Sequence, residues 1–258
     1  MDDSLHLKVS GAVATVTLRR PAAHNALDEP LAVNLAQAFQ KLGVADLVRV
    51  VVLEAEGDSF CAGADLGWLG RVAAMEAADA QREAMTLAVA LDAVARCPKP
   101  VIAVVQGAAL GLGAGLVAAA DMAVASETAS FALTEVRLGL VAAVPAPYLA
   151  DAMGVRACRR FMLTGERFDA REAMRLGLVH GVTAADKLAA ARDHLVEACL
   201  KGAPRAQADS KDILRLAADT PVGPDLLRLT AGRLADSVRS EEGRWGLEAF
   251  ADGRKPEW

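Results

Sequence analysis

The sequence predicts an α/β core followed by a helical C-terminal region. Segments typical of strands and of helices alternate through the first half of the chain, as they do in α/β folds. Several of the strand-like segments are continuous apolar runs rich in β-branched residues, which is typical of buried strands. Beyond about residue 145 the strand signals become few and helical patterns follow one another.

Two strands and a helix open the α/β part. Residues 12–18 alternate as a strand does, and residues 48–53 have the pattern of a buried strand. Between them, Asp28-Glu29-Pro30 predicts a helix start, because the carboxylate can cap the helix and proline is tolerated in its first turn. Gly43 ends this helix. One face of it is apolar, formed by Leu31, Leu35, Phe39 and Leu42.

The next elements continue the alternation. After a turn-rich passage at 57–65, a long helix is expected over 79–96, ending at Cys97-Pro98. A strand at 101–105, a Gly-rich turn and a helix to about Ala120 come next, followed by a strand at 122–124.

The C-terminal part is predicted to be mostly helical. Asp169-Ala170-Arg171-Glu172 forms a capping box ahead of a short helix that Gly177 closes. Further helical patterns begin at Ala184, Pro204, Pro224 and Ser240. We divide the chain into an α/β core at 1–200 and a helical region at 201–258. The apolar faces of these helices exceed what one small core can cover, which indicates contacts between subunits.

Composition and charge exclude several classes of function. The net charge is −5 and the pI is about 5.5, so the basic surface that nucleic-acid binding requires is missing. The four cysteines lie far apart without a CxxC pair, and the four histidines form no HExxH motif, so no metal site is expected. Unpaired thiols fit a reducing compartment. With no apolar targeting segment after the acidic start, we expect a cytoplasmic protein.

Residues 101–120 carry no charge and are long enough to span a bilayer. The first five residues are mainly β-branched, however, and Gln106-Gly107 interrupts the stretch ahead of a Gly-rich turn that leads into an Ala-rich helix. We therefore interpret the window as strand, turn and helix, and we expect no membrane partner.

Two Gly-containing turns, at 60–66 and 107–113, each follow a predicted buried strand. Small residues let backbone N–H groups approach a ligand closely, and the second turn also opens a helix whose positive end favours an anionic oxygen. Two such N–H groups could form an oxyanion hole. The GxGxG spacing at 111–115 differs from a dinucleotide fingerprint, and 57–61 lacks the final glycine of a GxSxG nucleophile motif.

Six segments in order make the chain resemble the enoyl-CoA hydratase/isomerase (crotonase) superfamily over nearly its whole length. They are Leu18-Arg19-Arg20-Pro21 with Asn25-Ala26-Leu27, Phe60 to Leu66, Gly107 to Gly113, Phe131 to Leu140, Leu163 to Glu166 with Gly177-Leu178-Val179, and Glu241 to Pro256. The resemblance implies a core of repeated ββα units, a C-terminal region that forms trimers or hexamers, and an acyl-CoA thioester substrate. It implies no cofactor, because coenzyme A is part of the substrate.

The resemblance also implies roles for particular residues. The oxyanion donors would be the backbone N–H groups of Ala64 and Leu112. His24 would lie near the CoA phosphates. The remaining substrate-binding positions are Ala62, Ala64, Asp65, Leu66, Gly111 and Leu112.

One catalytic acid of the two-glutamate hydratases is missing from this sequence. Gly115 occupies the first acidic position, and Glu135 occupies the second. The alternative for Glu135 is a surface carboxylate or a salt-bridged one, with Arg137 as a candidate partner. The segment 133–140 looks most like bacterial methylglutaconyl-CoA hydratases, so we expect hydration of a 2-enoyl-CoA, with leucine breakdown as one pathway. A Δ3-Δ2-enoyl-CoA isomerase using the same glutamate, and a non-catalytic acyl-CoA-binding protein, are the alternatives.

Overall fold

A computed structural model of the chain describes residues 3–258. Met1 and Asp2, with which the predicted core segment 1–200 begins, lie outside the described residues.

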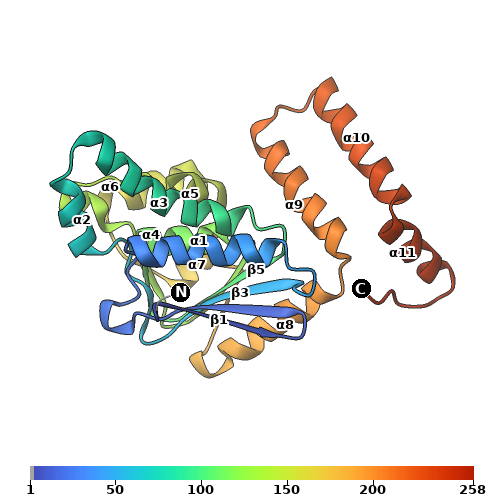
Figure 1. The fold of residues 1–258 in the computed structure, drawn as a ribbon, viewed down its shortest axis with the longest axis horizontal. Coiled ribbons are helices and arrows are strands. Elements are labelled where there is room, and N and C mark those ends of the chain that lie inside the picture. Colours follow the sequence, from blue (N-terminus) through green and yellow to red (C-terminus); the bar gives the residue numbers. More distant parts are fainter. Residues whose placement is uncertain (1–2) are drawn as a thin grey trace.

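Two β-sheets form the centre of the fold (Figure 1). In the larger sheet β1 and β2 pair antiparallel and the remaining neighbours pair parallel. Its strands, in spatial order, are β1 (Leu5–Ser10), β2 (Val13–Leu18), β3 (Val50–Ala55), β5 (Val101–Val105), β7 (Met122–Ser126) and β10 (Gly181–Thr183). In the smaller sheet the first three strands are parallel and the last is antiparallel. Its strands are β4 (Ser59–Cys61), β6 (Ala108–Leu110), β8 (Ser130–Ala132) and β9 (Phe168–Asp169).

The two sheets arise from a repeated unit. The pairs β3–β4, β5–β6 and β7–β8 each place one strand in the larger sheet and the next strand in the smaller sheet. Helical segments follow each pair. This arrangement confirms the predicted α/β core of ββα units.

Alternation along the strands directs side chains to opposite faces of the larger sheet. On β3, Val51 and Leu53 join the main core with helices α1 (Glu29–Gly43), α3 (Ala77–Ala95) and α4 (Leu112–Ala119). Val50 and Val52 face the other way and pack against α8 (Leu188–Leu200). Figure 1 shows α1 and α8 on opposite sides of the sheet. Both faces are therefore covered, which explains why these strands are apolar throughout.

The capping residues predicted from the sequence are in place. The Asp28 carboxylate accepts the Leu31 N–H at the start of α1, with a distance of 3.1 Å. The Asp169 carboxylate accepts the Glu172 N–H at 2.8 Å and caps α7 (Ala170–Leu176). Both helices begin where their signals predicted.

Several short elements differ from the prediction. Helix α2 (Leu66–Ala73) begins directly after the turn-rich passage and was not predicted, and α5 (Ala146–Met153) and α6 (Val155–Thr164) occupy a stretch with no predicted element. Strands β9 and β10 have two and three residues. Aromatic packing stabilises β9, since the centre of the Phe168 ring lies 5.6 Å from that of Phe131 and 4.1 Å from that of Phe161.

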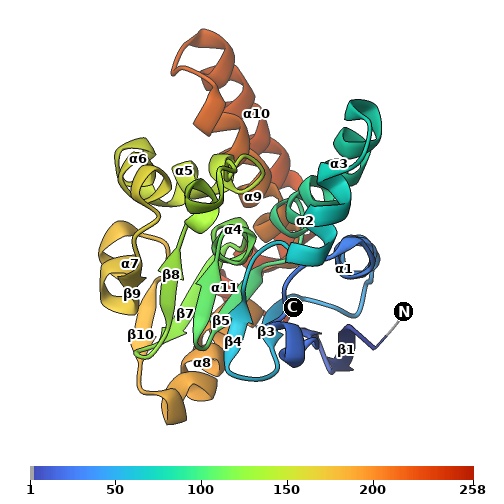
Figure 2. The same cartoon turned by 90° about the vertical axis from the view of Figure 1, so that its left-hand side faces the viewer.

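Helices α9 (Pro204–Asp219), α10 (Pro224–Arg239) and α11 (Glu241–Ala251) extend away from the two sheets (Figures 1 and 2). The Lys211 ammonium holds α9 to the core through the Asp121 carboxylate at 2.6 Å and the Lys99 carbonyl at 3.1 Å. Large apolar side chains on the three helices are exposed, including Leu214, Leu227, Leu234, Leu247 and Phe250. The division after residue 200 and the role of this region in oligomerisation stay predictions.

The charge-free window 101–120 forms β5, β6 and α4, as the interpretation of strand, turn and helix required. Among residues 3–258, every helix is too short or too polar to cross a membrane.

Candidate active site

Three neighbouring strands of the smaller sheet end at the predicted site. β4, β6 and β8 run parallel, side by side, so their carboxyl ends lie at the same edge. Ala64 follows β4, Leu112 follows β6 and Glu135 follows β8. Ligands of parallel sheets commonly bind at this edge. The topology thus brings together three positions that are separated by 48 and 23 residues in the sequence.

The first two turns are in close contact because glycine occupies key positions. Gly63 has a φ of +99°, and a Cβ atom added there would lie 2.9 Å from the Leu110 carbonyl oxygen. That Cβ would also lie 3.6 Å from the Leu112 nitrogen. A Cβ on Gly113 would overlap the Cys61 carbonyl. Side chains at these positions would force the two turns apart.

The Ala64 N–H is left free by the way its turn is held. The Leu27 N–H donates to the Gly63 carbonyl at 2.7 Å, and the Asp65 N–H donates to the Leu27 carbonyl at 2.8 Å. Because successive peptide groups of an extended segment face opposite sides, the Ala64 N–H faces away from Leu27. In the described part of the chain it has no hydrogen-bond acceptor.

The Leu112 N–H is free for a different reason. Leu112 is the first residue of α4, and the first N–H groups of a helix have no partner within it. No acceptor for this N–H is found between residues 3 and 258. Two free donors on adjoining turns are what an oxyanion hole requires.

Glu135 lies on the same edge and against the second turn. It belongs to a 3-10 helix, Thr134–Leu138, that follows β8. Its carboxylate occupies the space where a Cβ on Gly111 would lie. Its Oε2 atom is buried, and no hydrogen-bond partner for it exists among the described residues. Burial raises the pKa of Glu135, which makes the carboxylate a stronger base than an exposed glutamate.

The alternative that pairs Glu135 with Arg137 is wrong. The Arg137 side chain packs on Gly165. Its Nε atom lies 2.9 Å from the position that a Cβ added to Gly165 would occupy. Its Nε donates to the Thr164 carbonyl at 3.4 Å. Glu135 therefore keeps an unpaired carboxylate at the edge where the two donors lie.

His24 and Ala62 lie together beside the first turn. The Ala62 N–H donates to the His24 carbonyl at 2.9 Å, and His24 Nδ1 lies 3.2 Å from the Ser59 hydroxyl. The His24 side chain is exposed. Its predicted role near the CoA phosphates stays a prediction.

Asp65 and Leu66 begin α2 immediately after Ala64. The Asp65 carboxylate accepts the Trp68 N–H at 3.0 Å and lies 3.3 Å from the Arg20 guanidinium. The Trp68 N–H and then Arg20 hold the pKa of Asp65 below its usual value. Asp65 thus caps a helix next to the Ala64 N–H, and its role in substrate binding stays a prediction. Leu66 is 71% exposed, and its role in substrate binding stays a prediction as well.

Two residues that support the site had no role in the sequence interpretation. Arg20 donates to the Ala26 carbonyl at 2.6 Å and pairs with both Asp28 and Asp65. Asn25 has a φ of +55°, is fully buried, and donates to the carbonyls of Glu56 and Ser59 at 2.8 Å each. Both lie in the 18–27 segment, but their partners are brought close by the fold.

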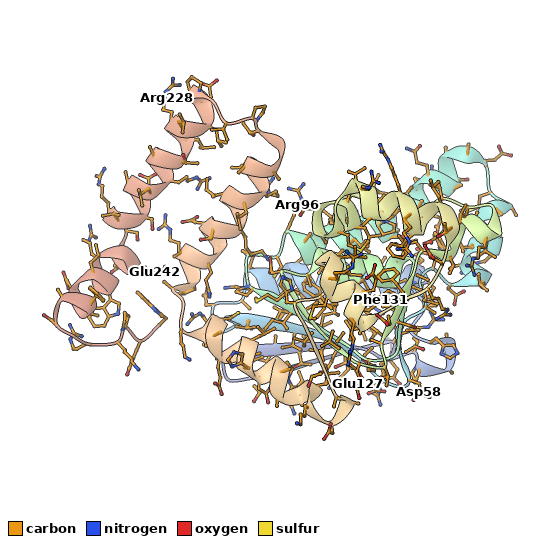
Figure 3. All side chains as sticks on the ribbon, turned by 180° about the vertical axis from the view of Figure 1, so that it is seen from behind. Asp58, Arg96, Glu127, Phe131, Arg228 and Glu242 are labelled. Carbon is orange, nitrogen blue, oxygen red and sulfur yellow. The ribbon has the colours of Figure 1, made fainter. Side chains whose placement is uncertain are left out.

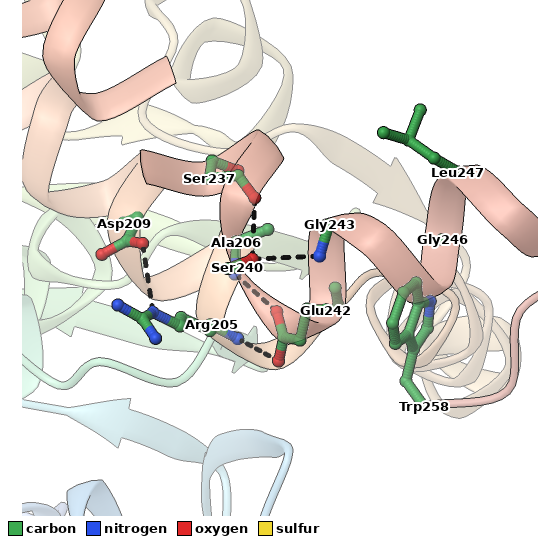
Figure 4. Close-up of a pocket in the computed structure, with 11 residues that line it drawn as sticks. Arg205, Ala206, Asp209, Ser237, Ser240, Glu242, Gly243, Gly246, Leu247 and Trp258 are labelled. Atoms are coloured by element: carbon green, nitrogen blue, oxygen red, sulfur yellow. Dashed lines mark hydrogen bonds and ion pairs between the residues drawn. The ribbon is translucent and has the colours of Figure 1, made fainter. Parts of the chain in front are cut away.

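A cavity of about 260 Å³ lies elsewhere, between α9, α10, α11 and Trp258 (Figure 4). Its main charged groups already have partners. The Glu242 carboxylate accepts the N–H groups of Arg205 and Ala206, and Arg205 pairs with Asp209. This cavity lacks the free donors and unpaired base that characterise the edge of the smaller sheet.

Within residues 3–258, no cluster of three or more His, Cys, Asp or Glu side chains could hold a metal ion. The four cysteines are buried and free.

Comparison with known proteins shows the family of this chain. The family model described as Enoyl-CoA hydratase/isomerase matches residues 8–258. An enoyl-CoA hydratase structure from Shewanella pealeana superposes with a TM-score of 0.95 at 39% identity, covering 99% of this chain and 96% of that chain. An enoyl-CoA hydratase structure from Mycobacterium smegmatis gives 0.93 at 32% identity, covering 99% and 98%. The carnitinyl-CoA dehydratase of Proteus mirabilis is 34% identical over 100% of this chain and 99% of its own length. The chain therefore belongs to the enoyl-CoA hydratase/isomerase family, within the crotonase superfamily of enzymes.

Proposed function

We propose that this enzyme adds water to a 2-enoyl-CoA thioester and forms the 3-hydroxyacyl-CoA. The observation that supports it most is the buried, unpaired carboxylate of Glu135 lying against the turn that carries the Leu112 N–H. A surface glutamate with a structural role would have a cationic partner or an Oε2 atom open to solvent instead.

The reaction follows from the three groups at the sheet edge. The N–H groups of Ala64 and Leu112 bind the thioester oxygen as negative charge develops on it, each contributing roughly 3–4 kcal/mol to transition-state stabilisation. Glu135 takes a proton from water while the hydroxyl adds to C3 of the substrate. The same carboxyl group then delivers the proton to C2. The thioester is thus hydrated with one acid–base residue and no cofactor besides its own CoA.

The CoA part of the substrate would extend from this edge past the first turn. We assign His24, Ala62, Asp65 and Leu66 to that path, together with Gly111 beneath the acyl carbonyl. The segment 133–140 supports a branched acyl group of the methylglutaconyl type and a place in leucine breakdown. Assembly into trimers or hexamers in the cytoplasm belongs to the same proposal.

An isomerase is the second candidate, and the absence of a carboxylate at Gly115 favours it. One carboxylate is enough to move a proton from C2 of a 3-enoyl-CoA to C4, whereas water addition in the two-glutamate enzymes uses two. Both reactions need the same oxyanion donors.

Parallel assays with a 2-enoyl-CoA and a 3-enoyl-CoA separate the two reactions, because hydration alone consumes water at C3. We expect the wild type to hydrate the 2-enoyl substrate and Glu135→Gln to lose at least ~100-fold in turnover. Glu127→Gln, on the exposed turn at the opposite end of β8 (Figure 3), is the matched control and should keep its activity. Unchanged hydration by Glu135→Gln would refute the assignment. CoA-ester binding without product from either substrate would support the non-catalytic alternative.

A further inference from the structure

Other side chains fill the space that an acidic side chain at position 115 would need. Gly115 is buried in α4, and its N–H donates to the Gly111 carbonyl at 3.0 Å. It therefore lies one helical turn beyond the residue that contacts the Glu135 carboxylate. A Cβ added to Gly115 would lie 2.5 Å from the Cβ of Pro145 and 3.0 Å from Cδ2 of Leu91. Contacts this short between carbon atoms are repulsive.

Neither neighbour can easily move aside. Pro145 is buried, and its carbonyl accepts the Leu149 N–H at 3.0 Å in the first turn of α5. The pyrrolidine ring has no rotamer that would clear the space, because its φ and side chain are joined in one ring. Leu91 is fully buried on α3. The surroundings are also apolar, so a carboxylate at 115 would lose hydration without gaining a hydrogen bond.

We propose that Pro145 is a specificity-determining residue of this enzyme: its ring excludes a second acidic side chain at position 115 and restricts the active site to Glu135. The inference rests on the proposed function, which makes Glu135 the acid–base residue. Two features of the sequence, Gly115 and the proline-containing turn at 144–147, are thus one packed pair although 30 residues separate them.

The consequence for the chemistry is that a single carboxyl group handles the proton throughout. One O–H bond of water breaks, the C3–O bond forms, and the proton that Glu135 accepts forms the new C2–H bond. Because carbon atoms of Pro145 and Leu91 occupy the space beside Gly115, the attacking water has Glu135 as its one ionisable partner from this chain instead of two carboxyl groups.

A double-mutant cycle tests whether the Pro145 ring prevents a side chain at position 115. We expect Gly115→Glu to lower the melting temperature by roughly 5–10 °C, as overpacking of a buried site does in a chain of this size. Adding Pro145→Gly should recover at least half of that loss. Pro147→Gly is the matched control, because Pro147 lies exposed in the same turn and should recover nothing. If Gly115→Glu yields no folded protein, Gly115→Ala carries the same cycle, since its single Cβ meets the same atoms.

The pH dependence of kcat/KM tests the restriction to one acid. The wild type should show one carboxyl ionisation, and the Gly115→Glu/Pro145→Gly variant should show a second. Full stability of Gly115→Glu with Pro145 present, equal recovery by Pro147→Gly, or an unchanged pH profile in the folded double variant would each overturn the proposal. The melting temperatures do not depend on the reaction, so a failure of the proposed function would leave this part of the test intact.

Discussion

Replacing Glu135 by Gln should stabilise the folded protein at neutral and alkaline pH while it abolishes catalysis. Burial raises the pKa of this carboxyl in the folded state, whereas in the unfolded chain it titrates near its usual value of about 4.3. Below that value the carboxyl is protonated in both states, so its ionisation does not change the stability. As the pH rises through the folded-state pKa, the buried carboxylate must ionise without a partner, and the wild type loses stability that the Gln variant keeps.

The size of the effect follows from what surrounds the carboxylate. Its Oε2 atom is buried without a hydrogen bond, and its other oxygen lies against Gly111. A buried polar group without a partner costs about 1–3 kcal/mol, and more when it is charged. The Gln amide would still lack a partner, so the variant should recover part of this amount, about 1 kcal/mol at pH 8. In a chain of this length that corresponds to an increase of roughly 2–4 °C in melting temperature.

Thermal unfolding followed by circular dichroism from pH 4 to pH 8 measures this difference. The curves of the wild type and Glu135→Gln should converge at pH 4 and separate as the pH rises. Glu127→Gln should follow the wild type, because it removes the charge of an exposed glutamate in the same chain. A Glu135→Gln variant that melts at or below the wild-type temperature at pH 8 would refute the reasoning, since it would mean that the carboxylate has a stabilising partner.

Three further predictions concern the turns and the C-terminal helices. Gly63→Ala should lower kcat/KM by at least ~100-fold, because a Cβ there displaces one of the two proposed oxyanion donors; Gly70→Ala, where a Cβ meets open space on α2, is the control that should remain active. Equal activity of both variants would contradict the contact between the turns. Lys211→Met should cost about 2–4 kcal/mol at pH 7, measured by urea unfolding, because it removes the cationic partner of the half-buried Asp121 carboxylate, which keeps the Val101 N–H as a donor; the double variant with Asp121→Asn should be milder, and an additive loss would argue against the pair. Burial raises the pKa of Cys61 to about 12, so iodoacetamide at pH 8 should label it in the unfolded protein and leave it unmodified in the folded protein, as mass spectrometry would show; rapid labelling of Cys61 in the folded protein would exclude this burial.

Elements with local signals could be predicted from the sequence. Asp28 and Asp169 cap the helices that their neighbours predicted, and 101–105 forms the buried strand expected from its β-branched residues. Helix α6 and strand β9 were missed because their stability depends on packing: the ring of Phe168 in β9 packs on that of Phe161 in α6 and on that of Phe131, which is 37 residues away in the sequence. Local propensity is weak in such short elements.

The candidate site shows the same division between local and distant information. The Gly-containing turns indicated two donors, and the structure places both N–H groups on adjoining turns without acceptors among the described residues. The burial of Glu135 could not be predicted from its neighbours, because Arg137, two residues away, would have offered it a partner. The structure turns Arg137 towards Gly165 instead, so the pairing was decided by the position of α6.

Four glycines of the site have different neighbours, and the neighbours determine how far each position can change. Gly63 and Gly113 lie against backbone carbonyls, which no substitution can remove, so side chains there are incompatible with the contact between the turns. Gly111 lies against the Glu135 carboxylate, so a side chain there would displace the proposed base itself. Gly115 lies against the side chains of Pro145 and Leu91, and side chains can be exchanged. It follows that the proposed oxyanion hole is fixed by backbone geometry, whereas the number of acidic groups beside it depends on a pair of side chains, and we expect a second carboxylate at 115 to be better tolerated when the proline at 145 is replaced at the same time.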